Sequence, residues 1–184
     1  MAFEAFFASI VTMELRAIAT HWAAARGSKR MPAWGDIDPV TIGRNLRYVW
    51  AWRYDAARES FIGRLAGEDI VRAFGKSPRG KPMHEFFTPE TYEAYLPWHL
   101  RVIEEPAFLY GSGRVYHRVG RNFTGERIML PLAENGTRGD GILGATYYLM
   151  NSGATAAAEQ PGSFPDKVAF FPLLGGGAAC ESSG

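Results

Sequence analysis

The stretch from Phe61 to Phe87 contains the pattern that comes nearest to a known chemical motif. Gly75 to Lys81 spells G-x-x-x-x-G-K, the first seven positions of a phosphate-binding loop. In such a loop a Ser or Thr follows the lysine and holds Mg²⁺, and a buried strand leads into the glycines. Here Pro82 follows, which offers neither a hydroxyl nor a backbone N–H, and residues 70–74 have a helical pattern. We therefore exclude nucleotide hydrolysis and interpret this turn as the hinge between two short helices.

Other catalytic and metal-binding patterns are incomplete. Cys180 is the one cysteine, which excludes a disulfide framework and a cysteine-rich metal site. His84-Glu85 begins like a zinc-protease helix, but Thr88 stands where the second histidine belongs. No Gly-x-Ser-x-Gly elbow is present. The sequence predicts no catalytic residue and no metal ligand.

Aromatic residues are the first candidates for a ligand pocket. Trp50, Trp52 and Tyr54 alternate along a predicted strand, so their side chains share one face of it. Together with Phe86 and Phe87 they could form a pocket for a small planar or apolar ligand, since such pockets are mostly apolar with few polar anchors. The competing interpretation is that this wall packs beneath an N-terminal helix.

Arg64 is the polar candidate. It lies within a predicted strand between Gly63 and Leu65, where a buried arginine must meet either a ligand anion or a carboxylate. Glu68, Asp69 or Glu85 would serve as that carboxylate. The remaining arginines of the predicted later strands are interpreted as a solvated or helix-pairing face: Arg114, Arg118, Arg121 and Arg127.

Composition limits the function classes. The chain has 184 residues, and 47% of them are hydrophobic, which is typical of a folded domain. Its net charge is +1, so it lacks the excess of positive charge that nucleic-acid-binding domains usually have. No run reaches the roughly 18 apolar residues of a membrane span. The apolar N-terminus lacks the basic flank of a signal peptide. We expect a cytoplasmic protein with neither nucleic-acid nor membrane partners.

The predicted elements describe an α+β protein with an antiparallel sheet. Apolar residues at helical spacing predict an amphipathic helix over residues 3–25. Two strands follow at residues 48–54 and 60–66, then several short helices and a longer helix over residues 88–105, interrupted at Pro97. Thr88 as N-cap and Pro89 at the first helical position predict where this longer helix begins. Three more strands follow at residues 108–119, 126–132 and 141–150. We divide the chain into an N-terminal helix (1–26), a domain (27–150) and a largely disordered Ala/Gly-rich tail (151–184). Residues 168–174 are too apolar for a free tail and should dock on the domain or on a partner.

Four separate segments, in the right order, resemble a bacterial PAS-like single-domain family. In chain order, the first is Met31 with Asp36 to Pro39, and the second is the strand-to-turn segment with Arg64 to Gly67, Phe74, Gly75, Gly80 and Lys81. The third is Arg127 to Leu132, and the fourth is Gly141 to Tyr147. The resemblance implies a five-stranded antiparallel sheet with short helices on one face. Some PAS domains bind haem through a histidine on the helix that faces the pocket, and His99 is the candidate here. Because adjacent helical residues point about 100° apart, His99 can face the pocket only if its neighbour Trp98 does not. Flavin adduct chemistry needs a cysteine among these helices, and Cys180 lies outside them.

From this resemblance we expect a non-catalytic sensory or interaction domain. It would bind a small ligand or a signalling partner protein, with homodimerisation through the N-terminal helix. The ligand pocket residues predicted are Trp50, Trp52, Tyr54, Arg64, Phe87 and His99, and no resident cofactor is assigned. Two alternatives stay open: an acid–base enzyme with Asp69 or Glu85 as base, and a purely structural dimerisation module.

Overall fold

A computed structural model describes residues 2–118, 121–136, 138–150, 165–173 and 180–181. The helices are α1 (Ala2–Ser9), α2 (Met13–Arg26), α3 (Pro39–Ile42), α4 (Glu68–Phe74), α5 (Met83–Phe86) and α6 (Pro89–Glu104), with 3₁₀ turns at Trp34–Asp36 and Gly43–Tyr48. The strands are β1 (Val49–Asp55), β2 (Ser60–Ala66), β3 (Ala107–Arg118), β4 (Arg121–Leu132), β5 (Gly141–Met150), β6 (Lys167–Pro172) and β7 (Cys180–Glu181).

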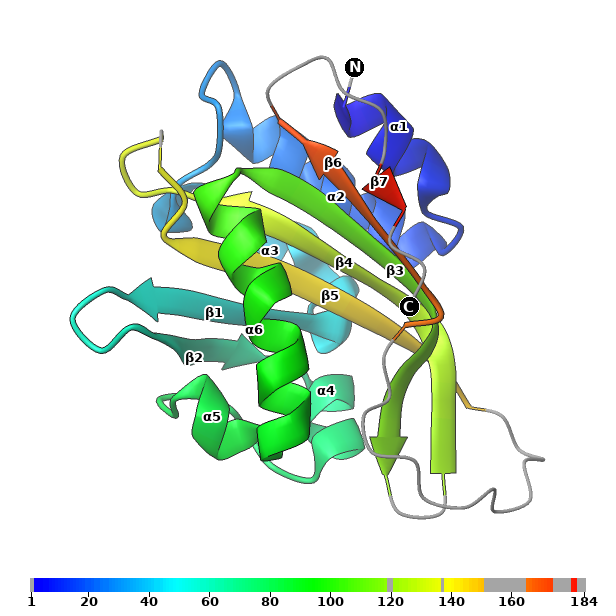
Figure 1. Ribbon diagram of the computed structural model, residues 1–184. Helices are drawn as coiled ribbons and strands as arrows, with labels where there is room; N and C mark the ends of the chain where they lie inside the picture. Colours follow the sequence, from blue (N-terminus) through cyan, green and yellow to red (C-terminus); the bar gives the residue numbers. More distant parts are fainter. Residues whose placement is uncertain (1, 119–120, 137, 151–164, 174–179, 182–184) are drawn as a thin grey trace.

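The strands form one antiparallel sheet in the order β2-β1-β5-β4-β3-β6-β7 (Figure 1). The predicted α+β class with an antiparallel sheet is confirmed. The predicted number of five strands is too small, because β6 pairs with the outer edge of β3 and β7 follows it. Phe170 and Phe171 of β6 are buried, and the burial of these two apolar side chains stabilises the docking of the segment on the sheet. The rest of the predicted tail lies outside the described residues.

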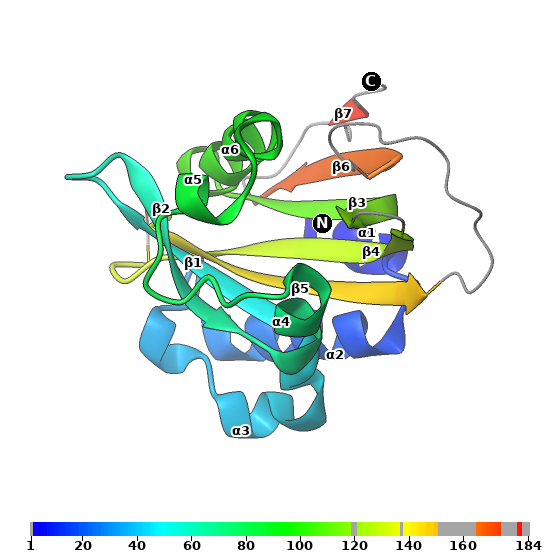
Figure 2. The ribbon, with the colours of Figure 1, turned by 90° about the horizontal axis from the view of Figure 1, so that it is seen from below.

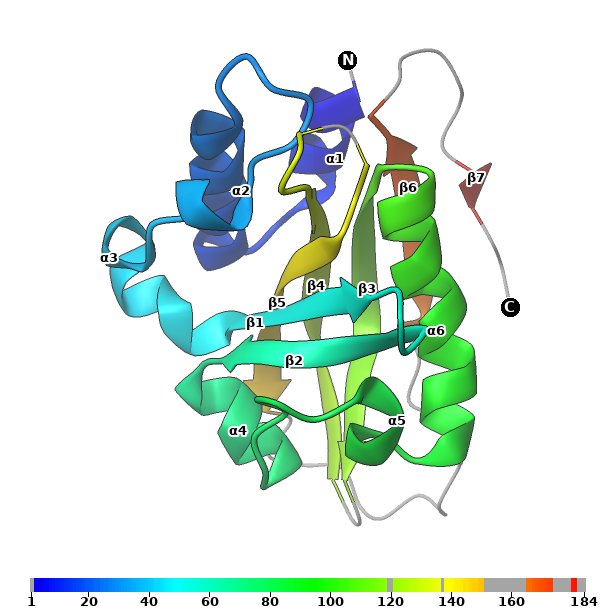
Figure 3. The ribbon, with the colours of Figure 1, turned by 90° about the vertical axis from the view of Figure 1, so that its left-hand side faces the viewer.

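Helices cover both faces of the sheet. Figures 2 and 3 show α1, α2 and α3 on one side and α5 and α6 on the other. Each face has its own apolar core: Phe6, Leu15, Trp22, Phe108 and Ile128 belong to the first, and Trp52, Phe61, Phe86, Tyr95 and Met129 to the second. The strand alternation of β4 and β5 therefore sends apolar side chains in both directions.

The N-terminal segment is broken where one helix was predicted. α1 ends at Ser9 and α2 starts at Met13. At the break the carboxylate of Glu126 on β4 accepts hydrogen bonds from the backbone N–H groups of Val11 (3.0 Å) and Thr12 (2.6 Å). Farther along α2, the indole N–H of Trp22 donates to the Pro131 carbonyl (2.9 Å). The start of α2 and its last third are thus hydrogen-bonded to β4. At the break, the bonds to Glu126 take the place of helical hydrogen bonds.

The connection from α4 to α5 lies along the free edge of β2. α4 ends at Gly75, which adopts the left-handed conformation with φ of 70°. The N–H of Gly63 donates to the Lys81 carbonyl (3.0 Å), and the N–H of Gly80 donates to the Gly63 carbonyl (2.8 Å). A Cβ at position 63 would lie 2.1 Å from the carbonyl oxygen of Pro78, so only glycine permits this approach. This connection, residues 75–82, is called the flap below.

α6 crosses the sheet beyond the flap (Figure 1). The Thr88 side chain accepts from the Thr91 N–H, and Pro89 occupies the first helical position, as the sequence predicted. The helix continues through Pro97 rather than dividing into two pieces. Its inner residues Tyr95, His99, Val102 and Ile103 face the second core.

Candidate functional site

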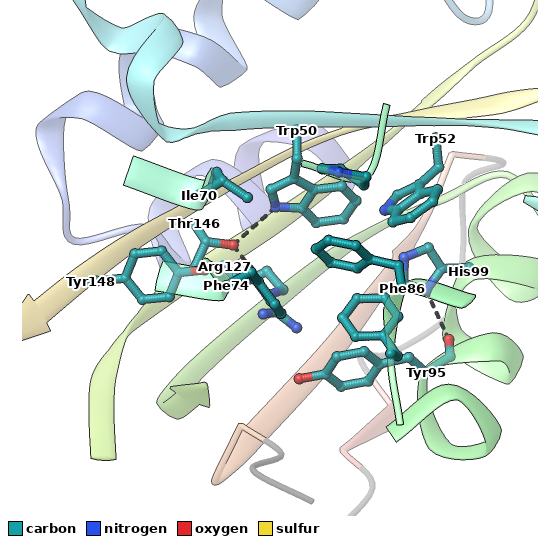
Figure 4. Close-up of a pocket in the computed structure, with 12 residues that line it drawn as sticks. Trp50, Trp52, Ile70, Phe74, Phe86, Tyr95, His99, Arg127, Thr146 and Tyr148 are labelled. Atoms are coloured by element: carbon teal, nitrogen blue, oxygen red, sulfur yellow. Dashed lines mark hydrogen bonds between the residues drawn. The ribbon is translucent and has the colours of Figure 1, made fainter. Parts of the chain in front are cut away.

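A small aromatic pocket lies between the sheet and helices α4 to α6 (Figure 4). Its cavity of about 20 Å³ has room for a water molecule. The lining residues come from β1, α4, the flap, α5, α6, β4 and β5: Trp50, Trp52, Ile70, Phe74, Pro78, Phe86, Phe87, Tyr95, His99, Arg127, Thr146 and Tyr148. In Figure 4, Thr146 and Arg127 lie at one end of this group and His99 at the other, with aromatic rings between them.

Four of the six residues predicted to form a pocket line this one: Trp50, Trp52, Phe87 and His99. Tyr54 lies farther along β1 and packs against Phe61, with ring centroids 5.0 Å apart. It lines a different hollow, which is more open to the surface.

The placement of Arg64 in the pocket was wrong. In the register of β1 and β2, Leu65 pairs with Ala51 and Gly63 pairs with Trp52, so Arg64 is the extra residue of a β-bulge. A bulge interrupts the alternation from which its direction was predicted. The side chain is exposed beside the surface hollow, together with Arg53 and Arg58.

The carboxylates proposed for acid–base chemistry do not line the pocket. Asp69 forms a bidentate ion pair with Arg47 (2.8 Å to each oxygen) and a longer one with Arg72 (3.2 Å). Glu85 is exposed on α5. The pocket therefore receives its polar character from other groups.

Arg127 was grouped with arginines of a solvated or helix-pairing face, and the structure excludes the solvated alternative for it. Its side chain is only 4% exposed. Nε donates to the Thr146 hydroxyl (3.2 Å), Nη2 donates to the Val115 carbonyl (2.8 Å), and the guanidinium lies 5.0 Å from the ring centroid of Tyr95. Burial opposes its charge, yet the nearby hydroxyls of Tyr95 and Tyr148 hold the pKa of Arg127 above its ordinary value. Alternation along β4 contained the signal, because residues 127 and 129 share a face and Met129 is in the second core.

Thr146 connects Arg127 to the aromatic wall. Its hydroxyl oxygen accepts from Arg127 Nε and from the Trp50 indole N–H (3.0 Å). Trp50 reaches Thr146 by lying across Gly144, where a Cβ would come within 2.2 Å of the indole ring. Because both acceptor positions of the hydroxyl are used, its hydrogen remains available to donate. No pattern in the sequence singled out Thr146 as a pocket residue.

His99 is the third polar group, and it is neutral. It is 2% exposed, and its Nδ1 lies 2.8 Å from the Tyr95 carbonyl, to which the neutral ring donates. Burial, with Arg127 nearby, lowers the pKa of His99 to about 3. Nε2 is therefore an unprotonated acceptor. Of the two adjacent residues of α6, His99 lines the pocket, and Trp98 is only partly buried and does not.

Haem does not fit this pocket. The neutral His99 ring donates its Nδ1–H to a carbonyl, as metal-binding histidines commonly do, but pockets for ligands of drug size enclose about 300–1,000 Å³. The cavity here is about 20 Å³, and bulky aromatic side chains occupy the space a macrocycle would need. Across the described part of the chain, no group of three His, Cys, Asp or Glu residues could hold a metal ion.

A family model described as a PAS domain matches residues 10–147. The chain belongs to the PAS domain family. The match extends from the α1–α2 junction to β5, so it includes every lining residue of the pocket except Tyr148. No curated protein and no solved structure matches the chain.

The family membership confirms the resemblance found in the sequence and makes this chain one of a class of sensory and interaction domains. In this PAS domain the flap and α4 to α6 cover one face of the sheet. None of its described helices is long and apolar enough to cross a membrane.

Proposed function

We propose that this PAS domain is a non-catalytic sensory module in bacterial signalling whose aromatic pocket binds a small ligand. The observation that carries the proposal is the set of polar groups buried in that pocket. Arg127, Thr146 and His99 place a cation, a hydroxyl donor and an imidazole acceptor among aromatic rings. An ordinary core gains little from such groups, because each loses its hydration when buried.

The output of the sensor would pass through β4 to the N-terminal helices. Glu126 and Arg127 are neighbours on this strand, and their side chains point to opposite faces. Arg127 lines the pocket, while Glu126 holds the α1–α2 junction through Val11 and Thr12. A ligand that moves β4 by a fraction of an ångström would thus act on both at once.

The α1–α2 junction also supports contact with another protein. Val11 and Met13 are 78% and 71% exposed, beside the carboxylate that holds the junction. We propose that this junction meets a second copy of the chain or a signalling partner. A ligand would act by favouring one of two docking states of the helices, and its effect is limited to its difference in affinity for them.

Native mass spectrometry of the gently purified protein tests the proposal, because it reports retained molecules and oligomeric state together. We expect the wild-type protein to retain a molecule of defined mass and to form a dimer. His99→Phe, which fills the cavity, should lose the molecule, whereas the exposed control Arg64→Met should keep it. A wild-type protein that retains nothing and whose thermal stability responds to no small-molecule class would contradict the proposal and favour the purely structural module.

A further inference from the structure

We propose that the ligand is a small organic monoanion with a flat apolar body, bound through its carboxylate to Arg127 and Thr146. This inference rests on the proposed function, since it names the chemical class that the pocket would take. It assigns the site to one end of the aromatic pocket, where β4 and β5 lie side by side.

The charge of Arg127 is the first argument. An arginine stays protonated at any physiological pH, and a buried cation is costly unless an anion compensates it. Among the described residues no carboxylate lies within the 4 Å of an ion pair to Arg127, and its hydrogen-bond partners are neutral oxygens. Exposed arginines of the same chain do have such partners, as in Arg47 with Asp69 and Arg114 with Asp166. The buried cation therefore has the greater need of an anion, and the described residues do not supply one.

The arrangement of donors is the second argument. A carboxylate oxygen accepts hydrogen bonds, and the guanidinium has five N–H groups in a planar fork that suits it. Two N–H···O bonds go to Thr146 and Val115, and the hydroxyls of Tyr95 and Tyr148 also interact with the guanidinium, so all of its present partners are neutral. The Thr146 hydroxyl, whose acceptor positions are occupied by Arg127 and Trp50, adds a donor beside the fork. The group that fits next to both is an acceptor with negative charge.

The rest of the pocket defines the body of the ligand and its charge. Trp50, Trp52, Phe74, Phe86 and Phe87 present flat apolar surfaces. His99 remains neutral, so the pocket contains one cation and matches a monoanion rather than a dianion.

A ligand larger than water must displace side chains from this cavity. Phe74 and Phe86 are suited to move, because they are the last residues of α4 and α5 and pack against each other, with ring centroids 4.9 Å apart. These helices have only seven and four residues. The flap edge is held to β2 by main-chain hydrogen bonds at Gly63. We therefore expect ligand binding to shift these two helices while that edge stays in place.

Matched pairs of carboxylates and amides test the inference. Butyrate, benzoate and phenylacetate are compared with butyramide, benzamide and phenylacetamide, by thermal shift and calorimetry at one fixed chloride concentration, which screens the exposed arginines equally. At least one carboxylate should stabilise the wild-type protein saturably, and its amide should bind at least about 10-fold more weakly, as expected for loss of a charge-assisted hydrogen bond. Arg127→Met should weaken carboxylate binding by about 10- to 100-fold, and the exposed control Arg64→Met should leave it unchanged.

Arg127→Lys serves if Arg127→Met does not fold, because it keeps the charge and loses the fork. It should still weaken the carboxylate more than the amide. Equal binding of acid and amide, or carboxylate binding that Arg127→Met and Arg127→Lys leave unchanged, overturns the inference. A neutral molecule retained by the wild-type protein, with no carboxylate bound, overturns the ligand class and leaves the sensory proposal standing. No binding by any probe and no retained molecule contradicts both.

Discussion

Acid is expected to destabilise this protein through His99. The folded protein holds the pKa of His99 at about 3, because the ring is buried and Arg127 is close, whereas the ordinary value is 6.5. Between these two values the unfolded chain binds a proton that the folded protein does not, so stability falls as the pH decreases below 6.5. Linkage gives a loss of about 2 kcal/mol between about pH 7.5 and about pH 5, or roughly 4–8 °C in Tm for a domain of this size.

Urea unfolding followed by tryptophan fluorescence, repeated across this pH range, measures the effect. The decisive quantity is the difference in unfolding free energy between wild type and His99→Phe, in which the titratable ring is gone. The unfolding free energy of the wild type minus that of His99→Phe should fall by about 2 kcal/mol from about pH 7.5 to about pH 5. The control His84→Phe removes a ring that is exposed and so solvated in both states, and it should follow the wild type. Parallel curves for wild type and His99→Phe would refute the assignment of His99 as a buried neutral ring.

Three further variants test the packing around the site by urea unfolding. Glu126→Gln should lose about 2–3 kcal/mol, because an amide cannot replace the charged acceptor at the α1–α2 junction, and a change below about 0.5 kcal/mol would contradict that role. Gly144→Ala should cost more than about 1 kcal/mol by displacing the Trp50 indole, while Gly35→Ala, with open space around it, should cost less; equal costs would argue against the close approach. Phe170→Ala should lose about 3–5 kcal/mol if β6 is part of the domain, against about 0.5 kcal/mol or less for the exposed Val40→Ala, and a small loss for Phe170→Ala would mean that β6 is dispensable.

Local patterns in the sequence sufficed where the physics is local. The alternating aromatics of β1 placed Trp50 and Trp52 in the pocket, and the cap and proline at Thr88 and Pro89 placed the start of α6. Pro82 excluded the phosphate-binding interpretation without any structure. The order of strands and helices was enough to predict the antiparallel α+β class.

The misplaced residues depended on contacts between distant parts of the chain. The break between α1 and α2 is set by Glu126, which lies 114 residues from Thr12. Arg64 was assigned by simple alternation, but the register with β1 makes it a bulge residue. Arg127 obeys alternation, but nothing local decides between a solvated and a helix-pairing face, because Tyr95 of α6 covers Arg127 only in the folded chain. The pairing of β6 with β3 could not be predicted either, because the edge of β3 against which Phe170 lies exists only in the folded sheet.

The central claim is that the pocket is a ligand site coupled across β4 to the N-terminal helices. Hydrogen-exchange mass spectrometry tests it most directly, by comparing the protein as purified with the same protein unfolded, dialysed and refolded. Occupancy of the pocket should slow exchange in residues 68–104 and change the exchange of Val11 and Thr12, whose N–H groups bind Glu126 on the opposite face of the sheet. Identical exchange in both preparations, or a change confined to the surface hollow of Arg53, Arg58 and Arg64, would contradict it.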